Sequence, residues 1–272
     1  MTLTERFLKS CSDEELKRLT KMTNGKKVAI NSIELFQKFE NLYTSDMRFL
    51  DILKSFEEIS NNSAIKNFGI KPHPGSINNC MGRWFELLFF KFFNEFLSAY
   101  STKDKLKEIC KLPSAKDSKK FMDLFVERQK TLLKKINPST SNPDFIILDN
   151  LTKSVYPVGL TWIEKFQNTS FFGNIDMQNI AAIISIKTSA RPDRRYQQLY
   201  EANLVKAIAL RFRKKVKFLS ITLHENIKNE EVYYSPSIIS IVQGGTLEPS
   251  IDKSATLDKI SDIKQIIEII FE

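Results

Sequence analysis

The chain has 272 residues, of which 42% are hydrophobic and 21 are phenylalanine, so it can bury a sizeable core and is not a disordered protein. Its net charge of +9 favours an anionic partner, nucleic acid before a membrane surface, although a lysine-rich solvated surface would give the same value. The 3 cysteines form no CxxC pair and charged residues interrupt the longest apolar stretch. We therefore expect a cytoplasmic protein without a disulfide framework, a cysteine zinc site or a membrane span.

The N-terminal half is expected to be mostly helical. Residues 1–60 contain short amphipathic patterns in which Ser or Thr precedes an acidic residue, as at helix starts, and predict a helical segment over residues 1–65. Residues 61–79 are rich in Pro, Gly and Asn, which indicates a loop or hinge. The apolar stretch 81–100, MGRWFELLFFKFFNEFLSAY, predicts a long core helix, and the lysine-rich residues 102–135 are also expected to be helical.

The pattern changes to strands in the C-terminal half. Runs of apolar and β-branched residues predict five strands, at 144–148, 154–163, 181–187, 216–223 and 235–242. Helices are expected over 194–213 and, with an amphipathic pattern, over 256–270. Residues 66–272 are therefore expected to form one α/β (α+β) domain in which helices flank a mixed central sheet.

Two absences in the sequence limit the kinds of catalytic site that the chain could form. The 2 histidines, His73 and His224, lie too far apart for an HExxH zinc site and are too few for a histidine-rich metal site, and a serine or cysteine triad would have to rest on one of them. The sequence also contains no GxSxG, GxGxxG or GxxxxGK[ST] pattern. Catalysis is therefore expected to use carboxylates, lysine and a bound metal ion.

Three features of the strand region could together form such a site. Asp144 opens one predicted strand, and Lys187 ends another, with Ser185 on the same face because side chains alternate along a strand. Glu201 follows on the next predicted helix. Each has an ordinary alternative explanation: a turn aspartate, a lysine reaching solvent and a solvated helix position. Together, however, two carboxylates can hold Mg²⁺ with water and phosphate oxygens, and a lysine can orient the attacking water.

A charged turn separates Lys187 from Glu201. It contains Arg191, Asp193 and Arg194 in the pattern R-x-D-R. Arginine binds O6 and N7 of guanine with two hydrogen bonds and aspartate accepts from N4 of cytosine, so this turn could read G·C pairs. A helix start capped by the aspartate, with solvated arginines, is the alternative. With Arg195, which follows directly, three arginines stand beside one acid and oppose the helix dipole, which indicates an anionic partner.

These residues resemble the NgoMIV-like, CCGG-reading type II restriction endonucleases of the PD-(D/E)xK superfamily. That superfamily places an acid two residues before the catalytic lysine, where this chain has Ser185, and an acid instead follows Lys187 by 14 residues, at Glu201. The run K-x-(S/T)-x-R-x-D-R followed by this displaced glutamate carries the resemblance, which covers about residues 74–212. It implies a PD-(D/E)xK restriction-endonuclease-like fold.

The resemblance also implies roles for the site residues. Asp144 and Glu201 would be metal ligands, Lys187 the catalytic lysine, and Ser185 the residue at the vacated acid position. Glu86, in the pattern G-x-x-F-E, would be an additional helix acid near a second metal position.

For DNA recognition, the resemblance implies that the CCGG core is read by Arg191, Asp193 and Arg194. Asn78 and Asn79 match a loop that approaches DNA from the minor-groove side. Arg83 departs from the pattern, because relatives often carry a small polar residue there.

The enzyme implied is a Mg²⁺-dependent type II restriction endonuclease of the prokaryotic cytoplasm. It would cut double-stranded DNA before the first C of CCGG and leave a four-base 5′ overhang, with Mn²⁺ able to replace Mg²⁺ and Ca²⁺ supporting binding only. A palindromic site implies a homodimer, and some relatives pair dimers into tetramers. Two alternatives stay open: a repair or junction-resolving nuclease of the same superfamily, and a non-catalytic basic DNA-binding protein.

Overall fold

The computed structural model describes most of the chain from residue 44 onward and two earlier strands. The described residues are 17–21, 27–31, 35, 44–100, 107–111, 124–136, 143–149, 161–162, 173, 175–188, 192–223, 235–244 and 246–272. Within them, no helix is both long and apolar enough to cross a membrane.

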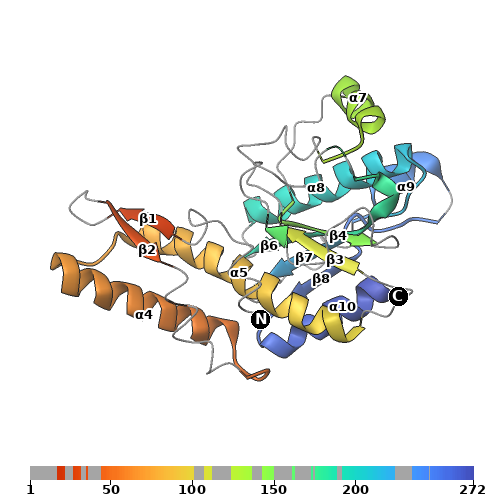
Figure 1. Cartoon of the computed structure of the whole chain (residues 1–272). Coiled ribbons are helices and arrows are strands. Elements are labelled where there is room, and N and C mark those ends of the chain that lie inside the picture. The colour runs from red at the N-terminus through yellow and green to blue at the C-terminus, as the bar shows by residue number, and fades with distance from the viewer. Residues whose placement is uncertain are drawn as a thin grey trace.

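A mixed sheet of six strands forms the centre of the described structure, in the order β5-β3-β4-β6-β7-β8 (Figure 1). The strands are β3 (Lys107–Lys111), β4 (Phe145–Asp149), β5 (Thr161–Trp162), β6 (Ile180–Lys187), β7 (Lys217–Thr222) and β8 (Lys253–Thr256). Strand β4 is antiparallel to β3 and β6, whereas β6, β7 and β8 run parallel. The mixed α/β architecture expected from the sequence is thereby confirmed.

Helices cover both faces of this sheet. Figure 1 shows α8 and α9 on one side and α5 and α10 on the other. The helices are α4 (Phe49–Phe68), α5 (Pro74–Tyr100), α7 (Glu127–Ile136), α8 (Pro192–Arg211), α9 (Ile238–Gln243) and α10 (Ile263–Phe271). Alternation along β6 divides the core, because Ile184 and Ile186 pack with α5 whereas Ile183 packs with α8.

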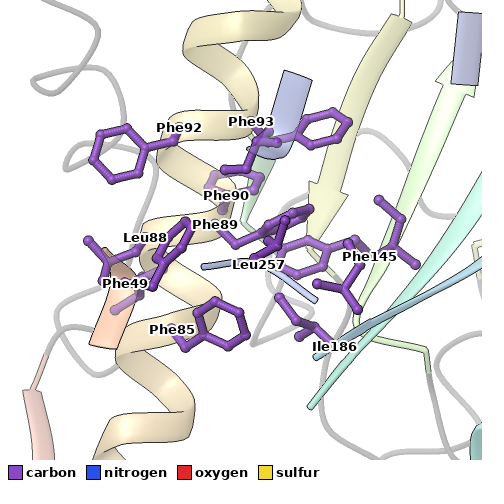
Figure 2. Close-up of a cluster of buried hydrophobic side chains, with 14 of the residues drawn as sticks. Phe49, Phe85, Leu88, Phe89, Phe90, Phe92, Phe93, Phe145, Ile186 and Leu257 are labelled. Carbon is purple, nitrogen blue, oxygen red and sulfur yellow. The ribbon is translucent and has the colours of Figure 1, made fainter. Parts of the chain in front are cut away.

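Helix α5 is the centre of the larger core (Figure 2). Its phenylalanines are buried on several sides, as expected for a helix that is apolar nearly all round. Phe85 lies edge-on to Phe49 of α4, with ring centroids 5.4 Å apart, and Phe89 lies 5.4 Å from Phe145 of β4. These contacts fix α5 against both the neighbouring helix and the strand that follows Asp144.

The loop predicted over residues 61–79 is wrong except at residues 69–73, which join two helices. Helix α4 continues through the polar residues after Asn61 because it presents them to solvent while Ala64 is buried. It ends at Gly69, whose φ of 74° favours glycine, and α5 begins at Pro74. The boundary expected between residues 65 and 66 thus falls inside a continuous helix.

Four other elements differ from expectation. Residues 17–21 and 27–31, expected to be helical, form the antiparallel strands β1 (Lys17–Lys21) and β2 (Lys27–Asn31). Residues 107–111 form β3, because they pair with β4, and β8 precedes the C-terminal helix, which begins at Ile263.

A fifth difference is at 235–242, where a strand was expected. Residues 238–243 form α9 instead, because the Ser237 side chain caps this helix by accepting a hydrogen bond from the amide of Ser240 at 3.1 Å. The other predicted segments lie outside the described residues, namely 1–16, 22–26, 32–34, 36–43, 102–106, 112–123, 154–160 and 163.

Asp176 ties α7 to the short helix η2 (Met177–Asn179) that precedes β6. Its carboxylate accepts hydrogen bonds from the side chains of Gln129 and Arg128, both at 2.7 Å, and from the amide of Gln178 at 3.0 Å. Partial burial raises the pKa of Asp176, but these hydrogen bonds outweigh it and hold the pKa below its ordinary value.

We expect Asp176→Ala to lower the free energy of unfolding at pH 7 by about 1–3 kcal/mol, because three donors lose their acceptor. Since the folded pKa is depressed, this stabilisation is fully present above the unfolded pKa of about 3.9 and is lost as pH falls through the folded pKa. Urea unfolding of both proteins at several pH values measures it. A difference that stays constant below about pH 4 would contradict this assignment.

Candidate active site

The start of β4 meets the end of β6 and brings Asp144 against Lys187. The paired register of these strands ends at Phe145 and Ile184, so Asp144 lies just beyond it. Its Oδ2 accepts hydrogen bonds from the amide of Ile186 at 2.7 Å and from Nζ of Lys187 at 3.0 Å. One carboxylate oxygen therefore fixes both the end of β6 and the lysine that it carries.

The negative charges of three carboxylates act on Lys187. Burial lowers the pKa of Lys187, but the charges of Asp144, Glu201 and Glu86, together with the hydrogen bond to Asp144, raise it above its ordinary value. Each of the side chains of Lys187 and Asp144 is 14% exposed, so solvent screens this pair only partly. The lysine is therefore an ammonium ion at neutral pH, a cation and hydrogen-bond donor.

Glu201 lies on the buried face of α8 and is only 2% exposed, which excludes a solvated helix position. Its neighbour Ala202 is also buried, because this face of α8 packs on the sheet. The Glu201 Oε1 accepts a hydrogen bond from Nε2 of Gln197 at 3.1 Å. Gln198 donates to the carbonyl of Ser185 at 3.3 Å, so adjacent glutamines orient the glutamate and attach its helix to β6.

Ser185 occupies the position two residues before Lys187 as a fully buried, neutral residue. In the parallel register it lies beside Ser220 of β7, which is also fully buried. Neither hydroxyl has a hydrogen-bond partner among the described residues. Ser185 thus brings no charge to the site.

Glu86 reaches the site from α5. This part of α5 lies beside the residue that follows Lys187, since a Cβ added at Gly82 would be 3.9 Å from Cγ2 of Thr188. The Glu86 Oε2 accepts from Nη1 of Arg83 at 3.1 Å, in an ion pair between residues one helical turn apart. The acid expected near a second metal position is therefore already paired with a cation of the protein.

The residues expected to read DNA lie at helix starts. Asp193 and Arg194, in the first turn of α8, are exposed, and their side chains approach to only 4.0 Å. Asn78 and Asn79 are exposed in the first turns of α5, so they lie on a helix and not on the expected loop. Arg191 lies outside the described residues.

A comparison with known proteins identifies the family. Residues 17–271 match the model of the Cfr10I/Bse634I restriction endonuclease family. The chain belongs to this family. The type II restriction enzyme Cfr10I of Citrobacter freundii is 29% identical over 216 residues, which cover 70% of this chain and 73% of that enzyme. The expectation of a type II restriction endonuclease, a nuclease that acts on DNA, is thereby confirmed at the level of the Cfr10I/Bse634I family.

Solved structures from this family have the same fold. The structure of Bse634I restriction endonuclease superposes with a TM-score of 0.71 at 22% identity and covers 100% of both chains. The structure of the type IIF restriction endonuclease Bse634I with cognate DNA gives a TM-score of 0.70 at 22% identity and covers 94% of this chain and 98% of that one. The restriction-endonuclease-like fold expected from the sequence is thus confirmed.

The donor set of this Cfr10I/Bse634I family member fits a hard divalent cation. Asp144 and Glu201 offer carboxylate oxygens, and Mg²⁺ is commonly held by one or two carboxylates with water and substrate phosphate completing its shell. Among the described residues, no cluster of three or more His, Cys, Asp or Glu side chains has the spacing of a complete metal cage.

Sequence reasoning missed the side chains that hold the site together. Gln197 lies four residues before Glu201 and Arg83 three residues before Glu86, which are the spacings at which helix side chains meet. Those spacings could have suggested both pairs. The contact of Gln198 with the carbonyl of Ser185 joins distant parts of the chain and has no local signal.

Proposed function

We propose that this protein is a Mg²⁺-dependent type II restriction endonuclease that cleaves double-stranded DNA at a palindromic site with a CCGG core. Cleavage before the first C leaves a four-base 5′ overhang. Mn²⁺ replaces Mg²⁺, and Ca²⁺ supports binding without cleavage. The observation that carries the proposal is the gathering of Asp144, Glu201 and Lys187 at the end of β6, with no histidine required.

The protein groups divide the chemistry between them. Asp144 and Glu201 would hold the metal ion, which supplies Lewis acidity toward water and the scissile phosphate when bound. The ammonium of Lys187, held by Asp144, donates a hydrogen bond to the reacting phosphate or water and offsets developing negative charge. The carboxylates around Lys187 raise its pKa and favour the cationic form of this side chain. Glu201 supplies from α8 the charge that Ser185 lacks.

Recognition and cleavage share one helix in this proposal. Arg191, Asp193 and Arg194 read the CCGG core in the major groove, and Arg194 lies about two turns before Glu201 on α8. Since α8 is attached to β6 through Gln198, a DNA contact at its start is coupled rigidly to the metal-binding carboxylate. Asn78 and Asn79, exposed on α5, contact the minor-groove side.

A palindromic site favours a homodimer in which each protomer reads one half-site and cuts one strand. Membership of a restriction endonuclease family, with both carboxylates and the lysine present, argues against a non-catalytic DNA-binding protein. None of the described contacts favours a repair or junction-resolving nuclease over sequence-specific cleavage.

Incubation of the protein with Mg²⁺ and plasmid DNA that carries many CCGG-centred sites tests the proposal. We expect discrete fragments, fragments of the same size with Mn²⁺, and a shifted but uncut DNA band with Ca²⁺. A smear, or preferential cutting of branched DNA over an intact duplex, would refute sequence-specific cleavage.

A further inference from the structure

Arg83 is an unusual residue for the edge of a metal site, because a guanidinium remains charged at all physiological pH values and is costly to bury without a counter-ion. Its side chain is 6% exposed and that of Glu86 is 22% exposed, and the two form an ion pair at 3.1 Å. The carboxylate of Glu86 is therefore a counter-ion of a fixed positive charge before any metal ion or DNA arrives.

The surroundings of Arg83 hold this charge in place. The next residue, Trp84, is fully buried and lies edge-on to Phe56 of α4, with ring centroids 5.7 Å apart. Phe85 packs in the same way against Phe49. A rotation of α5 would break these contacts, so they hold the helix in the orientation in which Arg83 pairs with Glu86.

Glu86 nevertheless belongs to the active-site region. The preceding turn of α5 lies near Thr188, the neighbour of Lys187, because a Cβ added at Gly82 would be 3.9 Å from Cγ2 of Thr188. The charge of Glu86 also acts on Lys187, in the same direction as the charges of Asp144 and Glu201. The Arg83–Glu86 pair therefore lies beside the reacting groups.

A divalent ion at Glu86 would meet two obstacles. The carboxylate charge that should attract it is already offset by Arg83, and the ion itself would lie against a buried positive charge in a poorly screened environment. By contrast, the pair formed by Asp144 and Glu201 brings two carboxylates to one lysine and keeps a net negative charge. The electrostatics thus favour a divalent ion between Asp144 and Glu201 and disfavour one at Glu86.

We propose that Arg83 supplies at Glu86 the positive charge that a second divalent ion would otherwise provide, so that each active site binds a single metal ion, held by Asp144 and Glu201. Arg83 is then a positioning residue that sets metal stoichiometry. This inference rests on the proposed metal-dependent nuclease, and it replaces the role of metal ligand that the resemblance implies for Glu86.

Calcium titration counts the ions directly. Ca²⁺ is titrated by isothermal calorimetry into the protein bound to a duplex with a central CCGG, with the duplex alone as a blank. We expect one ion per protomer for the wild-type protein and for Arg83→Lys, which keeps the charge. Arg83→Gln should bind two, because the carboxylate of Glu86 then lacks the neighbouring positive charge of Arg83. Two ions in the wild type, or one in Arg83→Gln, would overturn the inference.

Glu86→Gln provides a second test that does not depend on the folding of an Arg83 variant. This variant should still bind one Ca²⁺ with affinity within about threefold of wild type, and loss of the ion would show that Glu86 is a ligand. Cleavage by the wild-type protein distinguishes failure of the role proposed for Arg83 from failure of the proposed nuclease activity. Cleavage with two bound ions refutes only the role of Arg83, whereas no bound ion and no cleavage refute the metal-dependent nuclease as well.

Discussion

Replacing Lys187 with methionine should reduce the single-turnover rate of DNA cleavage by about 10³-fold or more while specific binding in Ca²⁺ persists. The variant keeps most of the side-chain volume but removes the ammonium that Asp144 holds at 3.0 Å. Asp144 also retains the hydrogen bond from the amide of Ile186, so the ends of β4 and β6 stay together. Quenched-flow cleavage and gel-shift assays measure the two effects separately.

A matched control is Lys215→Met, since the side chain of Lys215 is 89% exposed and pairs with Glu248 at the surface. This variant loses the same charge but should cleave at the wild-type rate. Wild-type cleavage by Lys187→Met would show that the lysine at the end of β6 has no catalytic role.

Arg194→Ala should lose discrimination between CCGG-centred and unrelated duplexes. Each bidentate contact between arginine and guanine is worth about 1–3 kcal/mol of discrimination, so a homodimer that uses Arg194 in both half-sites should lose about 2–6 kcal/mol. The guanidinium is exposed in the first turn of α8, so its removal should leave the fold intact. Competition gel shifts in Ca²⁺ with specific and unrelated duplexes measure the difference.

Arg211→Ala separates base reading from general charge. Arg211 is exposed in the last turn of the same helix, at the opposite end from Arg194. Both variants lose one positive charge and should weaken binding to unrelated DNA similarly. An unchanged preference for CCGG in Arg194→Ala would assign base reading to other residues.

The central strands were predictable because they are buried on both faces and therefore read as continuous apolar runs. This pattern predicted strands β4, β6 and β7. The sequence also predicted the helix after β6 and the helix around Phe89. Lys187 and Glu201 lie on these elements and Asp144 immediately precedes β4, so the sequence was sufficient to relate the three candidate site residues to the correct elements.

The peripheral elements were predicted less well because short segments carry weak or conflicting patterns. Strands β1 and β2 flank Asn24-Gly25, a dipeptide typical of hairpins, but the charged alternation of KRLTK also fits a helix. Helix α9 has the β-branched composition of a strand, and its form depends on the cap at Ser237 and on packing. Neither the cap nor the packing is visible in the local periodicity of hydrophobic residues.

Within the site, residue types and alternation predicted which groups could act, but not how they are held. The sequence indicated that Lys187 and Ser185 share a face. The three-residue spacing of Arg83 and Glu86 is compatible with an ion pair, but whether the two side chains meet depends on their conformations on a packed helix. Local pattern therefore predicted candidate reacting groups, and tertiary packing determined their charge environment.

Sequencing the ends of plasmid fragments produced with Mg²⁺ is the most direct test of a CCGG-reading nuclease built on Asp144, Lys187 and Glu201. Every end should begin at the first C of a CCGG core, with a four-base 5′ overhang on both strands, and Asp144→Asn should produce no such ends. Ends scattered over sequences without a common core, or identical ends from Asp144→Asn, would contradict the proposed recognition and chemistry.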